Sequence, residues 1–330
     1  MLLGGAVALM LVSLTACGEQ EKSGESSSRP PLGYNVAVVE PAAVVRHGQI
    51  GVAAKVDWTA VGRALGQAGP MQPGGVYRIN LPRTDLHVTV QGVPVQPAFA
   101  LTSYAAFKQT PYATRVMGDL ALLDHEVPAV MARLVQRRIL ITALHNHLLQ
   151  MAPHVMYLHY EGMGDAVHLA TDIRYALGAS ATPVGNAPAA RAAPAPAIDT
   201  AAIEKFLGRK GTVTNGLFTV SVPRPDTIRD MGAVIPPAMG VGTSFTFQPL
   251  GGGRAAVTGD FVLRKLEVNH VLNVLVYHGI EVTALHNQAL GDQPHLYYMH
   301  IWATGDATQL AQGLRAGVDQ IDHLQGLNGA

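Results

Sequence analysis

The most constraining feature of the sequence is that one segment of about 120 residues occurs twice. The string T-A-L-H-N contains His145, and it returns around His286, 141 residues later. A repeat of this length is a domain rather than the stacking unit of a solenoid. We therefore expect two copies of one fold, with loops as well as strands and helices equal in length. The 141-residue spacing runs without a gap through Val76/Leu217, Pro82-Arg83/Pro223-Arg224, Gly118-Asp119/Gly259-Asp260, Glu126/Glu267, His159/His300 and Gly164-Asp165/Gly305-Asp306.

The N-terminus has the features of an export signal. Residues 1–16 form an apolar run that is too short to span a bilayer, and the run ends in Leu14-Thr15-Ala16-Cys17. That tetrad has the form of a bacterial lipobox, in which the signal peptide is removed and the cysteine is acylated. Cys17 is the only cysteine, so a disulfide within the chain is impossible. We expect a lipoprotein anchored in a membrane of the cell envelope, facing the periplasm or the exterior.

Composition predicts the remaining boundaries. Residues 17–56 begin with a polar stretch rich in Ser, Glu and Pro, which is typical of a flexible tether and lead-in. A stretch rich in Ala and Pro at 179–197 is typical of a linker. The two repeat domains would then cover residues 57–178 and 198–330.

Hydrophobic periodicity within the first copy predicts an α+β fold. The order of its central elements is strand, helix, strand, strand, helix, and a short loop joins the two later strands. This order resembles a split βαβ, ferredoxin-like core, in which helices cover one face of an antiparallel sheet. We expect the two copies to pack with pseudo-twofold symmetry. The predicted helices are Asp57–Gly66, Glu126–Arg138 and Asp165–Leu177, and the predicted strands are Val76–Leu81, Leu86–Val90, Phe99–Phe107, Gly118–Leu123, Ile139–His147 and Val155–Tyr160.

The charge pattern excludes one class of partner. Charged residues make up 14% of the chain, and 23 Lys and Arg balance 23 Asp and Glu. No basic cluster is present, so we expect no nucleic-acid partner.

Histidines gather in one predicted β-hairpin of each copy. His145 and His147 are two residues apart on a strand and so share a face, and His159 joins them if it pairs near Ala143. Three neutral imidazoles can hold a transition metal with one position left open, zinc first and copper next. Because Gln288 replaces one histidine in the second copy, we expect the metal site in the first copy. The candidate ligands are His145, His147, His154 and His159, with His286, His295 and His300 as their weaker counterparts.

Other polar residues are candidates for chemistry beside such a metal. Asp119 and Glu126 are the candidate general bases. Arg83 and Asp85 are candidates for binding an anionic ligand, although Arg and Asp two residues apart commonly pair to fix a turn. Ser103, in Thr102-Ser103-Tyr104, is matched by Ser244 at the same spacing, and a strand-edge hydrogen bond suits it better than a nucleophilic role.

The repeated strings resemble a known group of proteins. Gly118-Asp119, Ala143-Leu144-His145-Asn146-His147, Pro153-His154-x-x-Tyr157-x-His159 and Gly164-Asp165 are similar to strings of the LppY/LpqO family of bacterial lipoproteins. The resemblance covers both copies. It implies a repeated domain and an envelope address, and it implies no reaction.

Two functions follow from these residues. The first is an envelope lipoprotein whose first repeat holds a metal, either as a hydrolase-type enzyme or as a metal-binding protein. The second is a module without catalysis, in which the histidines are core polar residues and a small molecule binds in the cleft between the repeats.

The lipobox generates the first testable prediction. Cys17→Ala removes the acylated side chain, so the mature protein should move from the membrane fraction to the soluble fraction on cell fractionation. A variant that stays in the membrane fraction would contradict the lipid anchor.

Overall fold

Each repeat is built on one six-stranded antiparallel sheet. The computed structural model describes residues 55–185 and 195–328, which belong to one compact unit, and the predicted signal peptide and Cys17 lie outside the described residues. The first repeat contains α1 (Trp58–Leu65), β1 (Met71–Gln72), β2 (Val76–Pro82), β3 (Val88–Val90), β4 (Val93–Val95), α2 (Pro97–Ala100), β5 (Thr102–Gln109), β6 (Thr114–Leu123), α3 (Val127–Gln136), β7 (Leu140–Asn146), β8 (Met151–Ala152), β9 (Val155–Gly164) and α4 (Ala166–Leu177).

The second repeat has the same order of elements, except that it has a 3-10 helix in place of α2 and no counterpart of β8. It contains α5 (Thr200–Leu207), β10 (Gly211–Thr214), β11 (Leu217–Val222), β12 (Arg229–Asp230), β13 (Ala233–Val234), the 3-10 helix η1 (Pro237–Met239), β14 (Thr243–Gly251), β15 (Arg254–Arg264), α6 (Val268–Tyr277), β16 (Glu281–His286), β17 (Leu296–Asp306) and α7 (Ala307–Asn328). No helix in the described part of the chain is long and apolar enough to cross a membrane.

The sheet order confirms the predicted fold class. The two sheets run β1-β2-β5-β6-β9-β7 and β10-β11-β14-β15-β17-β16, which is one topology used twice. In the first, β9 lies between β6 and β7 and is antiparallel to both, so β6, α3 and β7 form a split βαβ unit. The fold is therefore mixed α and β, with two homologous antiparallel sheets.

Local signals explain where the helices begin. The Asp57 carboxylate accepts hydrogen bonds from the backbone N–H groups of Thr59 and Ala60, and Asp165 does the same for α4. These side chains satisfy N–H groups that have no partner within the helix. The predicted starts of these two helices agree with the structure.

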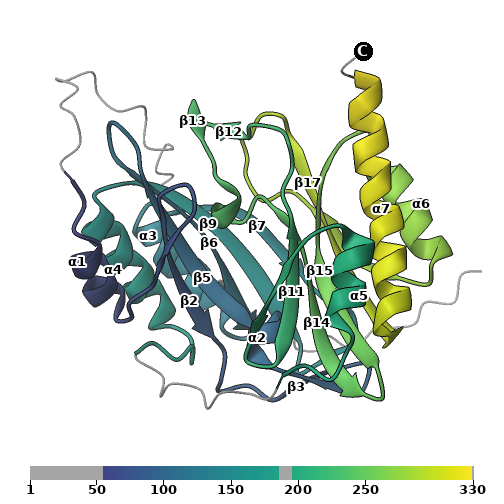
Figure 1. Cartoon of the computed structure of the whole chain (residues 1–330). Helices are drawn as coiled ribbons and strands as arrows, with labels where there is room; N and C mark the ends of the chain where they lie inside the picture. The colour runs from purple at the N-terminus through teal and green to yellow at the C-terminus, as the bar shows by residue number, and fades with distance from the viewer. Residues whose placement is uncertain (1–54, 186–194, 329–330) are drawn as a thin grey trace, which may run out of the picture. The chain divides into compact units, whose positions relative to one another are not determined.

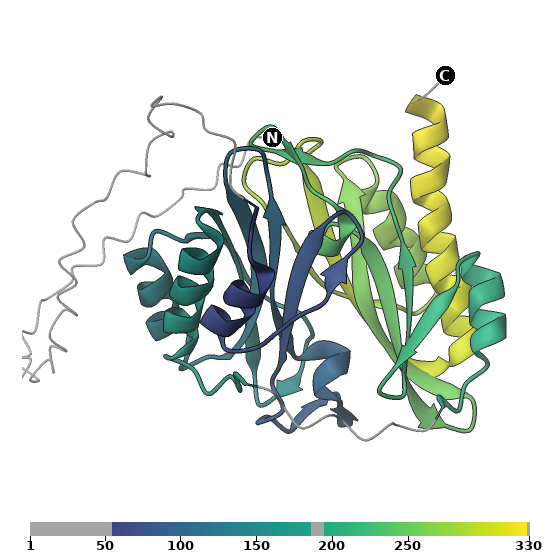
Figure 2. The same ribbon diagram turned by 60° about the vertical axis from the view of Figure 1, so that its left-hand side comes forward.

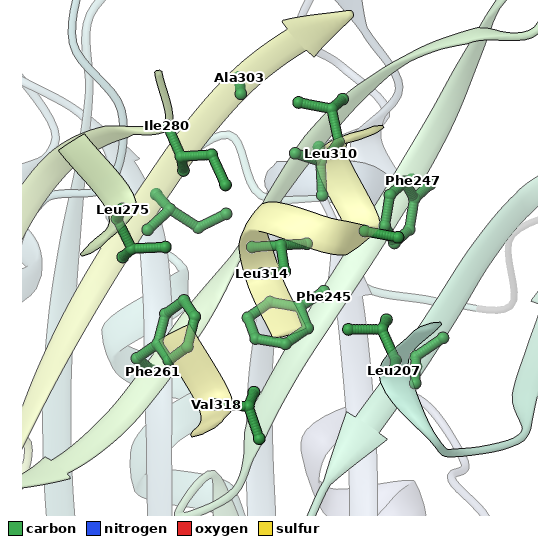
Figure 3. Close-up of a cluster of buried hydrophobic side chains, with 14 of the residues drawn as sticks. Leu207, Phe245, Phe247, Phe261, Leu275, Ile280, Ala303, Leu310, Leu314 and Val318 are labelled. Carbon is green, nitrogen blue, oxygen red and sulfur yellow. The ribbon is translucent and has the colours of Figure 1, made fainter. Parts of the chain in front are cut away.

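Each repeat has its own apolar core between its sheet and its helices. Figure 1 shows α1, α3 and α4 against the first sheet and α5, α6 and α7 against the second, and Figure 2 shows the same arrangement from another side. In the second core, Phe245 and Phe261 of the sheet pack against Leu314 and Val318 of α7 (Figure 3). The opposite faces of the two sheets are thus left for other contacts.

Those opposite faces contribute to two further apolar clusters that mix the repeats. One joins Phe99 and Tyr157 of the first repeat to Trp302 of the second, and the other joins Tyr104 to Tyr298. The segment around α2 reaches the second sheet, where the Gln96 N–H donates to the Gln248 side chain at 2.8 Å. Burial of large aromatic side chains favours association of the repeats, since apolar area removed from water contributes about 25 cal/mol per Å².

The structure corrects the predicted register of one strand. Ser103 Oγ accepts from the Ala121 N–H, and the same bond in the second repeat runs from the Val262 N–H to Thr243 Oγ1, each at 2.9 Å. Ala121 and Val262 keep the 141-residue spacing, but Ser103 and Thr243 are 140 apart. Ser103 therefore corresponds to Thr243 rather than Ser244, and an irregularity at Pro249/Gly251 in the following hairpin restores the spacing.

Two predicted strands also differ from those in the structure. Phe99 belongs to the short helix α2, because Pro97 at its first position suits a helix start, and β5 begins only at Thr102. The strand predicted at Leu86–Val90 is the shorter β3, which pairs with β4 and β8 in a separate three-stranded sheet.

Candidate metal centre between the repeats

The repeated T-A-L-H-N string forms the contact between β7 and β16. Asn146 Nδ2 donates to the Thr283 carbonyl at 3.0 Å, and Asn287 Nδ2 donates to the Thr142 carbonyl at 3.1 Å. Each repeat thus supplies the same donor and the same acceptor, as in a twofold-symmetric interface. The residue before each asparagine is a histidine, so these bonds bring His145 and His286 together.

Five histidines from both repeats gather at this contact. His145 and His286 stack with ring centroids 3.5 Å apart, and His147 lies 3.8 Å from His300 by the same measure. The fifth is His159 on β9, which pairs with Ala143, the register on which the sequence argument depended. Two groups of three offer one nitrogen per ring within 4.8 Å of one another, namely His145, His159 and His286, and His145, His147 and His300.

These groups correct the predicted location of the site. The sequence placed the ligands in the first copy alone, with the second copy as a weaker counterpart. Each group that the structure brings together includes a histidine of the second repeat, either His286 or His300. The replacement of His147 by Gln288 therefore does not make the second repeat dispensable, because its two remaining histidines complete the cluster.

Burial holds four of the five rings in the neutral form. His145 is 8% exposed, and burial together with the nearby His286 and His300 lowers its pKa to about 2. Burial, followed by the charge of His300, lowers the pKa of His286 to about 4. Burial also lowers the pKa values of His147 and His159 well below their usual range. Neutral imidazole is the form that binds a metal.

Hydrogen bonds at Nδ1 fix which nitrogen of three rings faces the centre. The Nδ1–H of His145 donates to the Asn146 carbonyl at 2.8 Å, and that of His286 donates to the Asn287 carbonyl at 2.7 Å. His300 Nδ1 contacts the Asp260 carboxylate. Because a carbonyl can only accept, the two neutral rings that bond one keep their lone pairs at Nε2. An acceptor at Nδ1 is the usual outer support of a metal-binding histidine.

His286 Nε2 and His300 Nε2 are 2.7 Å apart, which is a hydrogen-bond distance. Because His286 carries its proton at Nδ1, its Nε2 is the acceptor in this contact. The buried atoms His145 Nε2, His159 Nε2 and Asp119 Oδ1 have no hydrogen-bond partner among the described residues. Buried polar atoms are nearly always paired, so these donor atoms fit a transition metal ion.

Asp119 is the carboxylate next to this cluster. Its Oδ2 lies 3.8 Å from His147 Nε2 and 3.9 Å from His159 Nε2. Burial, followed by the negative charge of Asp260, raises the pKa of Asp119 to about 8. A carboxyl group with such a pKa can take up or release a proton near neutral pH.

The structure does not bring Glu126, Arg83 or Asp85 to the histidines. Arg83 Nη1 donates to Glu126 at 2.7 Å, and its Nε donates to Asp85 at 2.9 Å. Glu126 also accepts from the Leu123 and Ala181 N–H groups. All three are occupied in one buried network that ties β2 to the start of α3. The second repeat has the same network in Arg224, Asp226 and Glu267, so its role is structural.

His154 and His295 also lie outside the cluster. Their side chains are 46% and 48% exposed, and each Nδ1 contacts a nearby carboxylate, Asp124 at 2.7 Å and Asp292 at 2.8 Å. Neither belongs to the groups that can hold a metal.

Several site residues were missed by the sequence argument. Asp260 is the copy of Asp119, so the repeat itself contained the signal for it. Tyr157 stacks on His147 with ring centroids 3.7 Å apart, and no pattern pointed to that contact. Both residues line a cavity of about 720 Å³ between the repeats, together with His147, His159 and His300. The predicted ligand cleft therefore borders the histidine cluster through these three rings, and His145 and His286 lie outside its lining.

The fold and site define a protein of two homologous α+β repeats with a histidine cluster between them. The chain belongs to the family described as Domain of Unknown Function (DUF1259), which matches residues 59–179 and 201–320. The two matched segments confirm a repeated domain without an assigned function. No curated protein matches.

One solved structure is similar. It is a trimeric bacterial microcompartment shell protein, PduB, with 15% sequence identity, 80% of this chain and 93% of that chain covered, and a TM-score of 0.21.

The lowered pKa values predict how the metal-free protein responds to acid. A histidine whose folded pKa is depressed stabilises the fold fully above about pH 6.5, and this contribution is lost as the pH falls toward the folded pKa. With chelator present, the free energy of unfolding should fall below pH 6.5, by up to about 1.4 kcal/mol per pH unit for each such ring. His145→Asn should make that fall less steep in urea titrations at pH 7.5, 6 and 5.

The matched control is His168→Asn, because the His168 side chain is 86% exposed. It should keep the pH dependence of the parent protein. An equally steep fall in His145→Asn and in the parent would contradict a buried, neutral His145.

Proposed function

We propose that this protein binds one transition metal ion between its two repeats, through imidazole Nε2 atoms that both repeats supply. The observation that carries the proposal is that three such rings, drawn from both repeats, place a nitrogen each within 4.8 Å of one another. The carbonyl groups of Asn146 and Asn287 support the proposal, because they hold two of these rings in the binding tautomer.

The donor set favours zinc, with copper next. Zinc in proteins commonly takes three histidines and keeps a further position for water or substrate. Copper sites often add a thioether, and two methionines near the hairpin have other roles. Met151 packs in the apolar cluster with Tyr157, and Met156 packs against the first core.

The cavity gives such a metal access to a small molecule. A bound metal would polarise a substrate oxygen or lower the pKa of water. Asp119, beside His147 and His159, is placed to accept a proton from such a group. We infer metal-dependent chemistry on a small molecule, of the hydrolytic type. The alternative is binding without turnover, because a cavity of this size suits a bound ligand as well as a substrate. Retention of an unchanged ligand by the metal-loaded protein would distinguish binding from catalysis.

We also propose that the protein is an envelope lipoprotein related to the LppY/LpqO proteins. The lipobox at Cys17 and the repeated histidine strings support this, and the membrane would be a partner through the lipid anchor.

Metal content tests the main proposal. Protein purified without a histidine tag and incubated with Zn²⁺ should hold about one ion per chain by elemental analysis. His145→Ala and His286→Ala should each reduce affinity by about 100-fold or more, because each removes one of very few ligands.

The matched controls are His154→Ala and His295→Ala, which remove exposed histidines and should bind as the parent does. Protein that takes up none of Zn, Cu, Ni or Fe would contradict the proposal. If His145→Ala lost zinc binding and His286→Ala kept it in full, the metal site would belong to the first repeat alone.

A further inference from the structure

Arg78 is the one arginine or lysine among the described residues that line the cavity. It lies on β2, with its guanidinium 3.6 Å from the centre of the Tyr104 ring. Its Nε donates to the Asn80 side chain at 3.0 Å, and Nη1 donates to the Ala238 carbonyl of the second repeat at 2.9 Å. These contacts fix the position of the guanidinium, whose charge interacts with Asp119 without forming an ion pair.

The absence of a carboxylate partner distinguishes Arg78 from the buried arginines. Arg83 and Arg224 each pair with one aspartate and one glutamate. Arg115 pairs with Glu161 and with Asp230 of the other repeat. No carboxylate in the described part of the chain forms an ion pair with Arg78. Because partly buried cations are costly without a counter-charge, an anion is the natural complement to Arg78.

Arg78 also breaks the twofold symmetry of the cavity. At the 141-residue spacing, the second repeat has Thr219 in its place, and the structural counterpart of Tyr104 is Ser244. The positive charge of Arg78 therefore lies on the first sheet only, whereas the histidines lie where the two repeats meet. A ligand bound at both places would have one defined orientation.

The rest of the lining is mostly neutral and rich in hydrogen-bonding groups. Asn80, Thr102, Ser221, Ser244 and Thr246 all face the cavity. Hydroxyl and amide side chains suit a ligand that has hydroxyl groups of its own. A cavity of about 720 Å³ has room for a molecule of a few carbon atoms.

Charge balance points to a negatively charged ligand. A divalent metal ion and Arg78 together bring three positive charges. Asp119 and Asp260 bring two negative charges at most, and both line the same cavity. The site therefore keeps a net positive charge of at least one, which an anionic ligand would balance.

We propose that the cavity binds a small organic anion with several hydroxyl groups, whose carboxylate or phosphate is held by Arg78 and whose other end faces the histidines. This inference rests on the proposed metal site. It names the class of molecule on which that site acts.

Three compounds with the same six-carbon chain test the proposal. Sorbitol carries no charge, gluconate carries a carboxylate, and sorbitol 6-phosphate carries a phosphate. The zinc content of the full-length protein is measured first, and binding of each compound to the zinc-loaded protein is then measured by calorimetry at constant ionic strength. At least one of the two anions should bind about tenfold or more tightly than sorbitol, and the better of the two identifies the acid group.

Variants then assign the effect to Arg78. Arg78→Gln should lower affinity for the preferred anion by about tenfold or more, and Arg78→Lys should keep part of the preference, since it keeps the charge without the paired N–H groups. Zinc content should be unchanged in both. Arg254→Gln removes an exposed arginine at the start of β15 and should bind the anion as the parent does.

The outcomes separate the two proposals. Protein that binds no zinc contradicts the metal site. Zinc-loaded protein that binds neither anion better than sorbitol, or a folded Arg78→Gln variant that binds the anion as the parent does, overturns the inference about the ligand and leaves the metal site standing.

Discussion

Two reciprocal hydrogen bonds bring the histidines of the two repeats together. Asn146 donates to the Thr283 carbonyl, and Asn287 donates to the Thr142 carbonyl. Each bond contributes only about 1 kcal/mol net to stability, so these bonds matter mainly because they set the positions of the strands. They align the ends of β7 and β16, and the histidine before each asparagine then stacks on its counterpart. The same asparagines use their own carbonyls to fix the tautomer of those histidines. One short string thus joins the repeats and orients the rings that could hold a metal.

Buried polar groups in this protein are of two kinds, those paired with an opposite charge and those without such a partner. Arg83 with Glu126, and Arg115 with Glu161 and Asp230, are satisfied by opposite charges, and such networks hold elements in place. The histidine cluster has imidazole nitrogens without a partner, at His145 Nε2 and His159 Nε2, and a neighbouring carboxyl, Asp119, whose pKa is raised. Several unpaired nitrogen and oxygen atoms gathered around one point are what a metal site without its metal is expected to have. The contrast distinguishes the residues that hold the fold together from those that could hold a metal ion.

The sequence predicted the fold well, because the repeat, the helix caps and the strand periodicity are local signals that agree with one another. The three-histidine cluster of the first copy was expected only if His159 pairs near Ala143, and the structure has that pairing. The sequence did not predict that His286 and His300 complete the cluster, because contacts between repeats leave no periodic pattern within either one. The slip between Ser103 and Thr243 escaped detection because two compensating length changes keep the overall spacing. Glu126 and Arg83 looked like site residues because a buried ion pair and a catalytic pair use the same residue types.

The most direct test of a metal centre shared by the two repeats is an anomalous difference map from a crystal of the zinc-loaded protein, recorded at the zinc absorption edge. The structure predicts one strong peak within about 2.1 Å of imidazole nitrogens from both repeats, with His145 and at least one of His286 and His300 among them. A peak bound only by residues of one repeat, or no peak at the histidine cluster, would contradict it.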